Sequence, residues 1–140
     1  MIKHPGARTR ALYMWENRCV GPYLKLLNHY DIVIAAHTIW ESFQLPLHKL
    51  PVIEIKNVPI SYCLGRGLIV LKPADMEFLT LAHELVHARG FGSVKNPHNV
   101  GFVKNYAVCL DRFSNTYLKT ITNRTNAIYF YNEMRRINLL

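Results

Sequence analysis

Five consecutive residues, His83-Glu84-Leu85-Val86-His87, have the residue types and the spacing of a hydrolytic metal site. Histidines four positions apart on a helix project from the same face, about one turn from each other, so both imidazoles can reach one cation. Glu84 can reach a water at that cation without binding the metal. In zinc peptidases such a carboxylate accepts a proton from the attacking water and later delivers it to the leaving amine. We therefore predict a zinc site with His83 and His87 as ligands and Glu84 as the general base.

A catalytic zinc ion needs a third protein ligand and an open coordination position. His98 is the strongest candidate, because it follows the motif helix by one loop and we place it in the first turn of the next helix. The positive end of a helix disfavours imidazolium and so keeps a histidine ready to coordinate. The metzincin pattern would place a histidine where this chain has Ser93, and Asp111 and Glu133 are weaker candidates deep inside or beyond the later helices. The alternative is that the two motif histidines are ordinary helix residues and that His98 is a capping or surface residue.

The elements that must position these residues follow from the spacing of apolar residues. We expect helices around residues 12–20, 23–30, 32–43, 73–89, 97–118 and 127–137 and strands at 52–55, 60–64 and 68–71. Gly65-Arg66-Gly67 is a natural hairpin turn between the last two strands, and we expect an antiparallel sheet. The order of helices, small sheet and helices is an α+β arrangement of the zincin-like kind. The strand at 68–71 directly precedes the motif helix, where zinc peptidases use an exposed edge strand to hold the substrate backbone.

Composition and charge favour an intracellular protein with acidic partners. Seventeen Lys and Arg against nine Asp and Glu give a formal net charge of +8, and the excess lies in residues 1–30 and 104–140. Such a field raises affinity for nucleic acid, although a basic surface also serves solubility. The cysteines Cys19, Cys63 and Cys109 are too few and too widely spaced for a disulfide framework or a cysteine zinc cluster, so we expect reduced, buried thiols. The absence of a signal peptide and of a membrane-spanning run predicts a cytoplasmic location, and the length fits one domain over 1–140.

The motif and the residues after it resemble the SprT-like (Spartan-type) metalloprotease domain. That family has H-E-x-x-H, a variable loop and a third histidine with an aromatic residue four positions later, which here are residues 83–87, His98 and Phe102. The resemblance covers residues 60–102 and implies that the three histidines bind zinc and that Phe102 packs against the turn of His98. It also implies protein substrates, proteins bound to DNA among them. The chain departs from the family in its short loop before His98, in Asn99 where glycine is common, and in lacking the cysteine zinc ribbon.

Residues 78–85 also resemble the ImmA/IrrE-type peptidases, which cleave transcriptional repressors and use a downstream glutamate as third ligand. Here only Glu133 is available for that role. We therefore interpret the chain as a zinc metalloendopeptidase of SprT-like type, whose small size and basic flanks would suit a phage or mobile-element protein in a bacterial host. The alternative from another class is a non-catalytic, basic nucleic-acid-binding protein on a zincin scaffold, which has no use for Glu84. The sequence leaves the oligomeric state open.

Overall fold

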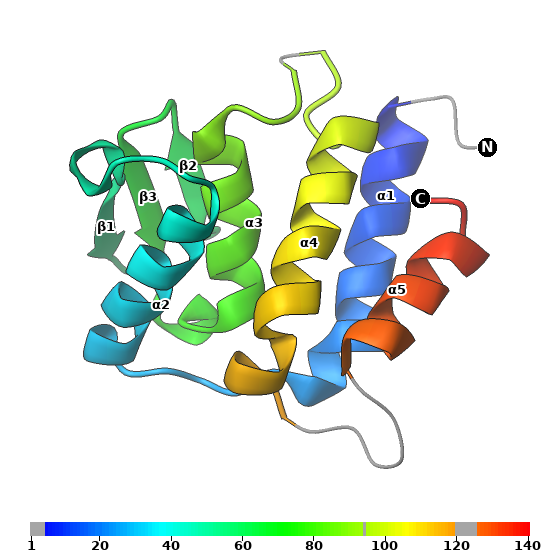
Figure 1. Ribbon diagram of the computed structural model, residues 1–140, viewed down its shortest axis with the longest axis horizontal. Helices are drawn as coiled ribbons and strands as arrows, with labels where there is room; N and C mark the ends of the chain where they lie inside the picture. The colour runs from blue at the N-terminus through cyan, green and yellow to red at the C-terminus, as the bar shows by residue number, and fades with distance from the viewer. Residues whose placement is uncertain (1–4, 94, 120–125) are drawn as a thin grey trace. The chain divides into compact units, whose positions relative to one another are not determined.

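The computed structural model describes residues 5–93, 95–119 and 126–140, and their elements form two compact units (Figure 1). Unit 1 contains the described residues of 1–24 and 91–140, and unit 2 contains Lys25–Gly90. The architecture is α+β, as predicted, with helices and one small sheet. That the chain acts as a single domain stays a prediction.

Unit 2 begins with α2 (His29–Ser42), whose start is set by a side-chain cap. The Asn28 side chain accepts a hydrogen bond from the backbone N–H of Asp31 at 2.8 Å, which satisfies one of the donors that a helix leaves unpaired at its first turn. The predicted helix at 23–30 is wrong. Gly21–Tyr23 form a 3-10 turn and Leu24 is extended, so helical structure resumes only after the Asn28 cap. Another 3-10 turn, Leu47–Lys49, leads to the sheet.

The sheet of unit 2 consists of β1 (Val52–Ile55), β2 (Tyr62–Leu64) and β3 (Leu68–Leu71), in the order β1-β3-β2. β2 and β3 form the predicted antiparallel hairpin, but β1 runs parallel to β3, so the expectation of a purely antiparallel sheet is wrong. Ile69, Val70 and Leu71 are fully buried. Because successive residues of a strand point to opposite faces, both faces of β3 are covered. The strand at 68–71 is therefore the central strand of the sheet. The expectation that it is an exposed edge strand is wrong.

The helix α3 (Phe78–Arg89) carries the histidine motif and packs against β2, β3 and α2. It starts later than predicted, because Pro73–Asp75 form a separate 3-10 turn and Glu77 is extended. The Glu77 carboxylate caps the helix by accepting hydrogen bonds from the N–H groups of Leu79 (2.9 Å) and Thr80 (2.8 Å). At the other end Gly90 has φ +101°, and its N–H donates to the carbonyl of His87 at 2.9 Å. The predicted stop at Gly90 is confirmed, since an L-residue rarely adopts this left-handed conformation.

Unit 1 is helical. It contains α1 (Pro5–Trp15), which continues through a π-helical turn (Glu16–Val20), and the helices α4 (Val100–Tyr117) and α5 (Asn126–Arg136). The ring of Trp15 makes edge contacts with Tyr106 and Phe130, and its indole N–H donates to the Phe130 carbonyl at 3.2 Å. The predicted helices at the start and end of the chain are confirmed in kind. Within the described residues, every helix is too short or too polar to cross a membrane.

Candidate metal centre

The motif residues begin at the middle of α3, which is buried along most of its length. His83 is 7% exposed and Glu84 is 9% exposed, while His87 is partly exposed. The ring centroids of the two histidines are 4.9 Å apart. The apolar stripe predicted for this helix is also present, because Phe78 and Leu85 are fully buried. The i, i+4 spacing thus brings the two imidazoles to one side of the helix, as predicted.

His98 lies immediately before α4 and not in its first turn, which corrects the predicted helix start at 96–97. The helix cap is Asn99, whose side chain accepts a hydrogen bond from the N–H of Phe102 at 3.0 Å. An asparagine is among the strongest N-caps, so the helix begins one residue after it. His98 therefore precedes the helix, and neighbouring side chains determine the surroundings of its ring.

Three residues of unit 1 hold the His98 ring, which is only 4% exposed. Nδ1 of His98 and the hydroxyl of Thr9 on α1 form a hydrogen bond of 2.9 Å. The ring also makes edge contacts with Tyr13, at a centroid distance of 5.6 Å, and with Phe102, at 5.0 Å. Metal-binding histidines typically hydrogen-bond through the nitrogen that does not face the metal, which fixes the ring and its tautomer. A partner at Nδ1 makes Nε2 the nitrogen suited to a metal.

The structure supports the two parts of the predicted ligand set separately. His83 and His87 present their rings on one side of α3 in unit 2, and His98 is held by Thr9, Tyr13 and Phe102 in unit 1. That the three histidines bind one metal ion stays a prediction. Three neutral imidazoles fit zinc, and they also fit copper, iron or nickel, so the donor set alone does not select the metal.

Glu84 has a neighbour that the sequence did not reveal. Cys63 lies on β2, where burial and then the negative charge of Glu84 raise the pKa of its thiol to about 11. The thiol also donates a hydrogen bond to the carbonyl of Gly65 at 3.1 Å. A thiol with this pKa is protonated at neutral pH and is therefore a poor ligand and a poor nucleophile. The charge of Glu84 thus raises the pKa of a cysteine on the edge strand β2. This effect depends on how β2 pairs with β3 and packs against α3.

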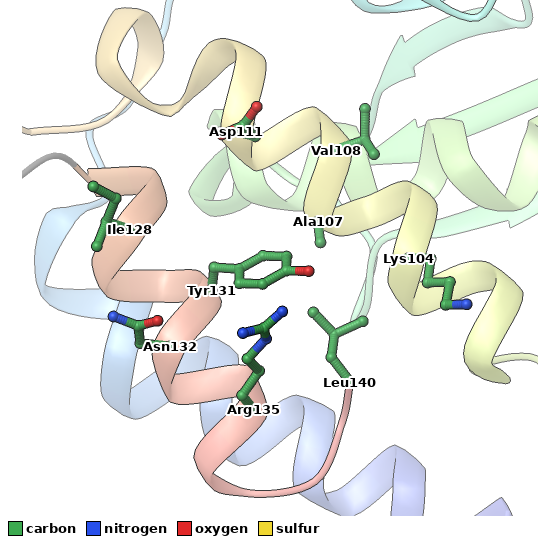
Figure 2. Close-up of a pocket in the computed structure, with 9 residues that line it drawn as sticks. All are labelled: Lys104, Ala107, Val108, Asp111, Ile128, Tyr131, Asn132, Arg135 and Leu140. Atoms are coloured by element: carbon green, nitrogen blue, oxygen red, sulfur yellow. The ribbon is translucent and has the colours of Figure 1, made fainter.

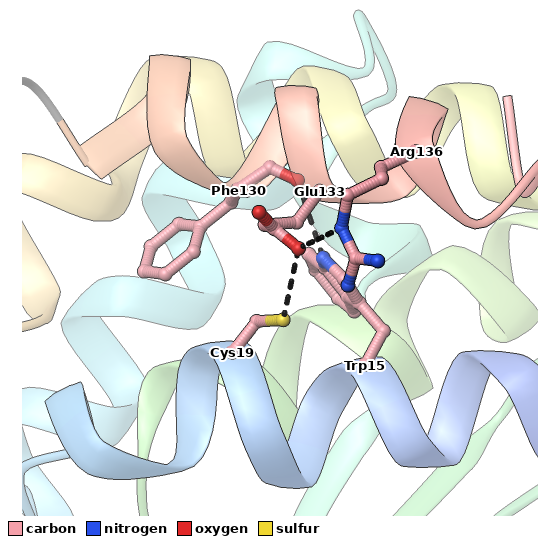
Figure 3. Close-up of polar contacts among 5 residues, drawn as sticks. All are labelled: Trp15, Cys19, Phe130, Glu133 and Arg136. Carbon is pink, nitrogen blue, oxygen red and sulfur yellow. Dashed lines mark hydrogen bonds and ion pairs between the residues drawn. The ribbon is translucent and has the colours of Figure 1, made fainter.

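The two weaker ligand candidates have other surroundings in unit 1. Glu133 on α5 accepts a hydrogen bond from Nε of Arg136 at 2.8 Å and one from the Cys19 thiol at 3.9 Å (Figure 3). Burial and the Glu133 charge raise the pKa of Cys19. Asp111 on α4 lines a separate pocket in unit 1. Of the three free thiols only Cys109 is buried, so the expectation of buried cysteines holds for that residue alone.

Comparison with known proteins does not identify a family. No protein-family model, no curated protein and no solved structure matches this chain. The resemblance of residues 60–102 to SprT-like domains, and the weaker one to ImmA/IrrE-type peptidases, therefore stay predictions. What this site does has to be argued from its own donor atoms and their surroundings.

Proposed function

We propose that the chain is a zinc-dependent peptidase in which His83, His87 and His98 bind the metal. The observation that carries the proposal is the pair His83 and His87 on one side of α3, with ring centroids 4.9 Å apart and Glu84 beside His83 on the same helix. Three protein ligands leave one position of a tetrahedral zinc ion open, which is the arrangement of catalytic sites. A structural zinc site would be expected to have a fourth protein ligand.

In the proposed hydrolysis of a peptide bond, Glu84 transfers one proton from the attacking water to the leaving amine. Zinc in such a site makes water a stronger acid and polarises a carbonyl group. The carboxylate of Glu84 accepts one proton from the attacking water as its oxygen bonds to the peptide carbon. Glu84 then delivers that proton to the amide nitrogen as the C–N bond breaks, so the carboxylate is regenerated. Because Glu84 is only 9% exposed, solvent competes weakly for the proton in transit.

The edge strand β2 is a better candidate for substrate binding than the central strand β3. β2 lies at one edge of the sheet, and Tyr62 and Leu64 on it are exposed. An exposed strand edge can pair with an extended peptide through main-chain hydrogen bonds. The charge of Glu84 raises the pKa of the Cys63 thiol on the same strand, so a peptide added to β2 would run near the general base. We propose β2 as the element that orients the substrate backbone.

The distribution of charge supports substrates associated with nucleic acid. Unit 1 contains eleven Lys and Arg and three Asp and Glu, whereas unit 2, which carries the H-E-x-x-H motif, contains six of each. The whole net charge of +8 therefore falls on unit 1. Such a concentration of positive charge favours contact with phosphate backbones. We propose intracellular proteins, including proteins bound to DNA, as the substrate class.

Metal content is the first test. Elemental analysis of the purified chain should find about one zinc per molecule. The variant His98→Ala should lose most of it, whereas His37→Ala, which removes an exposed histidine of α2, should keep it. Absence of metal from the wild type after reconstitution with zinc would exclude the peptidase.

The second test separates catalysis from metal binding. Glu84→Gln should retain zinc and lose cleavage of an unfolded protein such as casein by about 10²–10⁴-fold, the usual contribution of a general base. Wild-type cleavage by this variant would exclude the proposed mechanism.

A basic nucleic-acid-binding protein is the second candidate function, and the charge of unit 1 is the observation that favours it. A binder of this kind should have an affinity for DNA that falls steeply with salt and does not change with a chelator. A peptidase should lose cleavage with the chelator. The two measurements on one preparation therefore distinguish the candidates.

A further inference from the structure

A pocket of about 690 Å³ lies between α4 and α5, both in unit 1 (Figure 2). Its volume is within the range of pockets that bind small organic molecules, about 300–1,000 Å³. Three apolar or aromatic side chains on its walls are unusually exposed: Val108 by 46%, Ile128 by 58% and Tyr131 by 39%. Single exposed apolar residues are ordinary, but several around one hollow indicate a binding site. The pocket contains none of the residues proposed for the metal site.

The charges of the pocket favour an anion at one end. Lys104 on α4 and Arg135 on α5 line it, and the Arg135 guanidinium lies 4.7 Å from the centre of the Tyr131 ring, pointing into the pocket in Figure 2. Within the described chain, neither cation forms an ion pair. The adjacent Arg136, by contrast, is paired with Glu133 at 2.8 Å. The two pocket cations are thus available to a ligand.

The acidic residue of the pocket limits the ligand to a single negative charge. Asp111 is seven residues along α4 from Lys104, which corresponds to about 10 Å along the helix axis. A ligand with one anionic group can place it at Arg135, which points into the pocket, and stay clear of Asp111. A second anionic group at the far end would meet the Asp111 carboxylate and be repelled.

We propose that this pocket binds an amphipathic monoanion, such as a medium-chain carboxylate. The carboxylate lies at Arg135, Lys104 adds positive charge to the pocket wall, and the apolar body lies along Val108, Ile128 and the ring of Tyr131. Burial of the body supplies about 25 cal/mol per Å² of apolar area, and the cations fix its orientation. This assignment is independent of the peptidase proposal, since it involves neither the metal ligands nor Glu84.

Calorimetric titration of the full chain with decanoate, below its micelle concentration, tests the assignment. Decanol, which has the same tail without charge, and acetate, which has the charge without the tail, should both bind at least about tenfold more weakly than decanoate. The double variant Lys104→Gln/Arg135→Gln should also lose at least about tenfold in decanoate affinity. The matched control Lys95→Gln/Arg136→Gln removes the same residue types and the same net charge outside the pocket, and should bind decanoate like the wild type. Circular dichroism confirms that both variants are folded.

Three results would overturn the assignment. Equal affinity for decanol and decanoate would mean that the cations play no part. Equal losses in the two double variants would mean that decanoate responds only to net charge. Failure of decanoate to bind, with binding of an amphipathic helical peptide that carries an acidic residue, would make this surface a protein interface instead.

Discussion

The reactivity of Cys63 tests the placement of Glu84 against β2 inside unit 2. Burial, and after it the charge of Glu84, raise the pKa of this thiol from 9.0 to about 11. Only the thiolate reacts with an alkylating agent. At pH 8 a thiol of pKa 11 is about 0.1% ionised and one of pKa 9 about 9%, a difference of about 100-fold. A more basic thiolate is also a better nucleophile, by about 6–10-fold over two pKa units, so the net slowing is about tenfold.

The pH profile of alkylation tests the pKa of Cys63 more directly than the rate at one pH. Metal-free protein is treated with iodoacetamide between about pH 7 and pH 11, a range that extends past the ordinary pKa of 9.0 and up to the raised value. Each cysteine peptide is quantified by mass spectrometry. We expect the Cys63 rate to be still rising at pH 10, and Cys109, whose burial raises its pKa to about 12, to react later still. Glu84→Gln should shift the Cys63 profile to lower pH but not below the ordinary value, because burial is the larger cause. The control Glu41→Gln removes an exposed carboxylate of α2 and should not shift it. A wild-type midpoint near 9, or no shift in Glu84→Gln, would refute this placement of Glu84.

The further predictions concern three residues, Glu77, Gly92 and Thr9. Glu77→Ala should lower the free energy of unfolding by about 0.5–2 kcal/mol in urea titrations, because it removes the cap of α3. Since burial raises the Glu77 pKa, its contribution is fully present below the ordinary pKa of 4.5 and is lost as pH rises through the raised value, so the stability of wild type relative to Glu77→Gln should fall over that interval. Gly92→Ala should cost about 1–3 kcal/mol in urea titrations, because φ is +90° and the added Cβ would collide with the carbonyl oxygen of Pro97, whereas Gly67→Ala has open space and should cost less. Thr9→Val should weaken zinc binding about 10–100-fold in a chelator competition by releasing Nδ1 of His98, and unchanged affinity would show that Thr9 does not position the ring.

Local patterns predicted the elements of this fold better than their pairing. The spacing of apolar residues is a property of one segment, and it correctly placed α2, α4, α5 and the three strands. Parallel and antiparallel strands have the same side-chain alternation, so period alone cannot give the direction in which β1 pairs with β3. One signal was present in the run Leu68–Leu71, whose four consecutive apolar residues are typical of a strand covered on both faces. Weighing that run against the glycine hairpin would have favoured a central strand.

The same distinction applies to the candidate site. The spacing of His83 and His87 is local, so a helix prediction sufficed to bring the two rings together. The placement of His98 depends on Thr9, which is 89 positions away in the sequence, and nothing in either segment indicates that contact. Only the aromatic residue four positions after His98 indicated a neighbour, and Phe102 does contact the ring. The relation between Glu84 and Cys63 likewise depends on a strand that packs against α3, and no sequence pattern indicates it.

The distribution of charge bears on the choice between the two candidate functions, because Glu84 lies outside the basic unit. A protein that only binds nucleic acid would rely on the positive charge of unit 1, and the six balanced charges of each sign in unit 2 add nothing to that field. Glu84 is therefore better explained by a role in proton transfer than by binding. On this argument Glu84→Gln abolishes cleavage and leaves the salt-dependent affinity for DNA intact, and a variant that lost both would show that motif and charge serve one function.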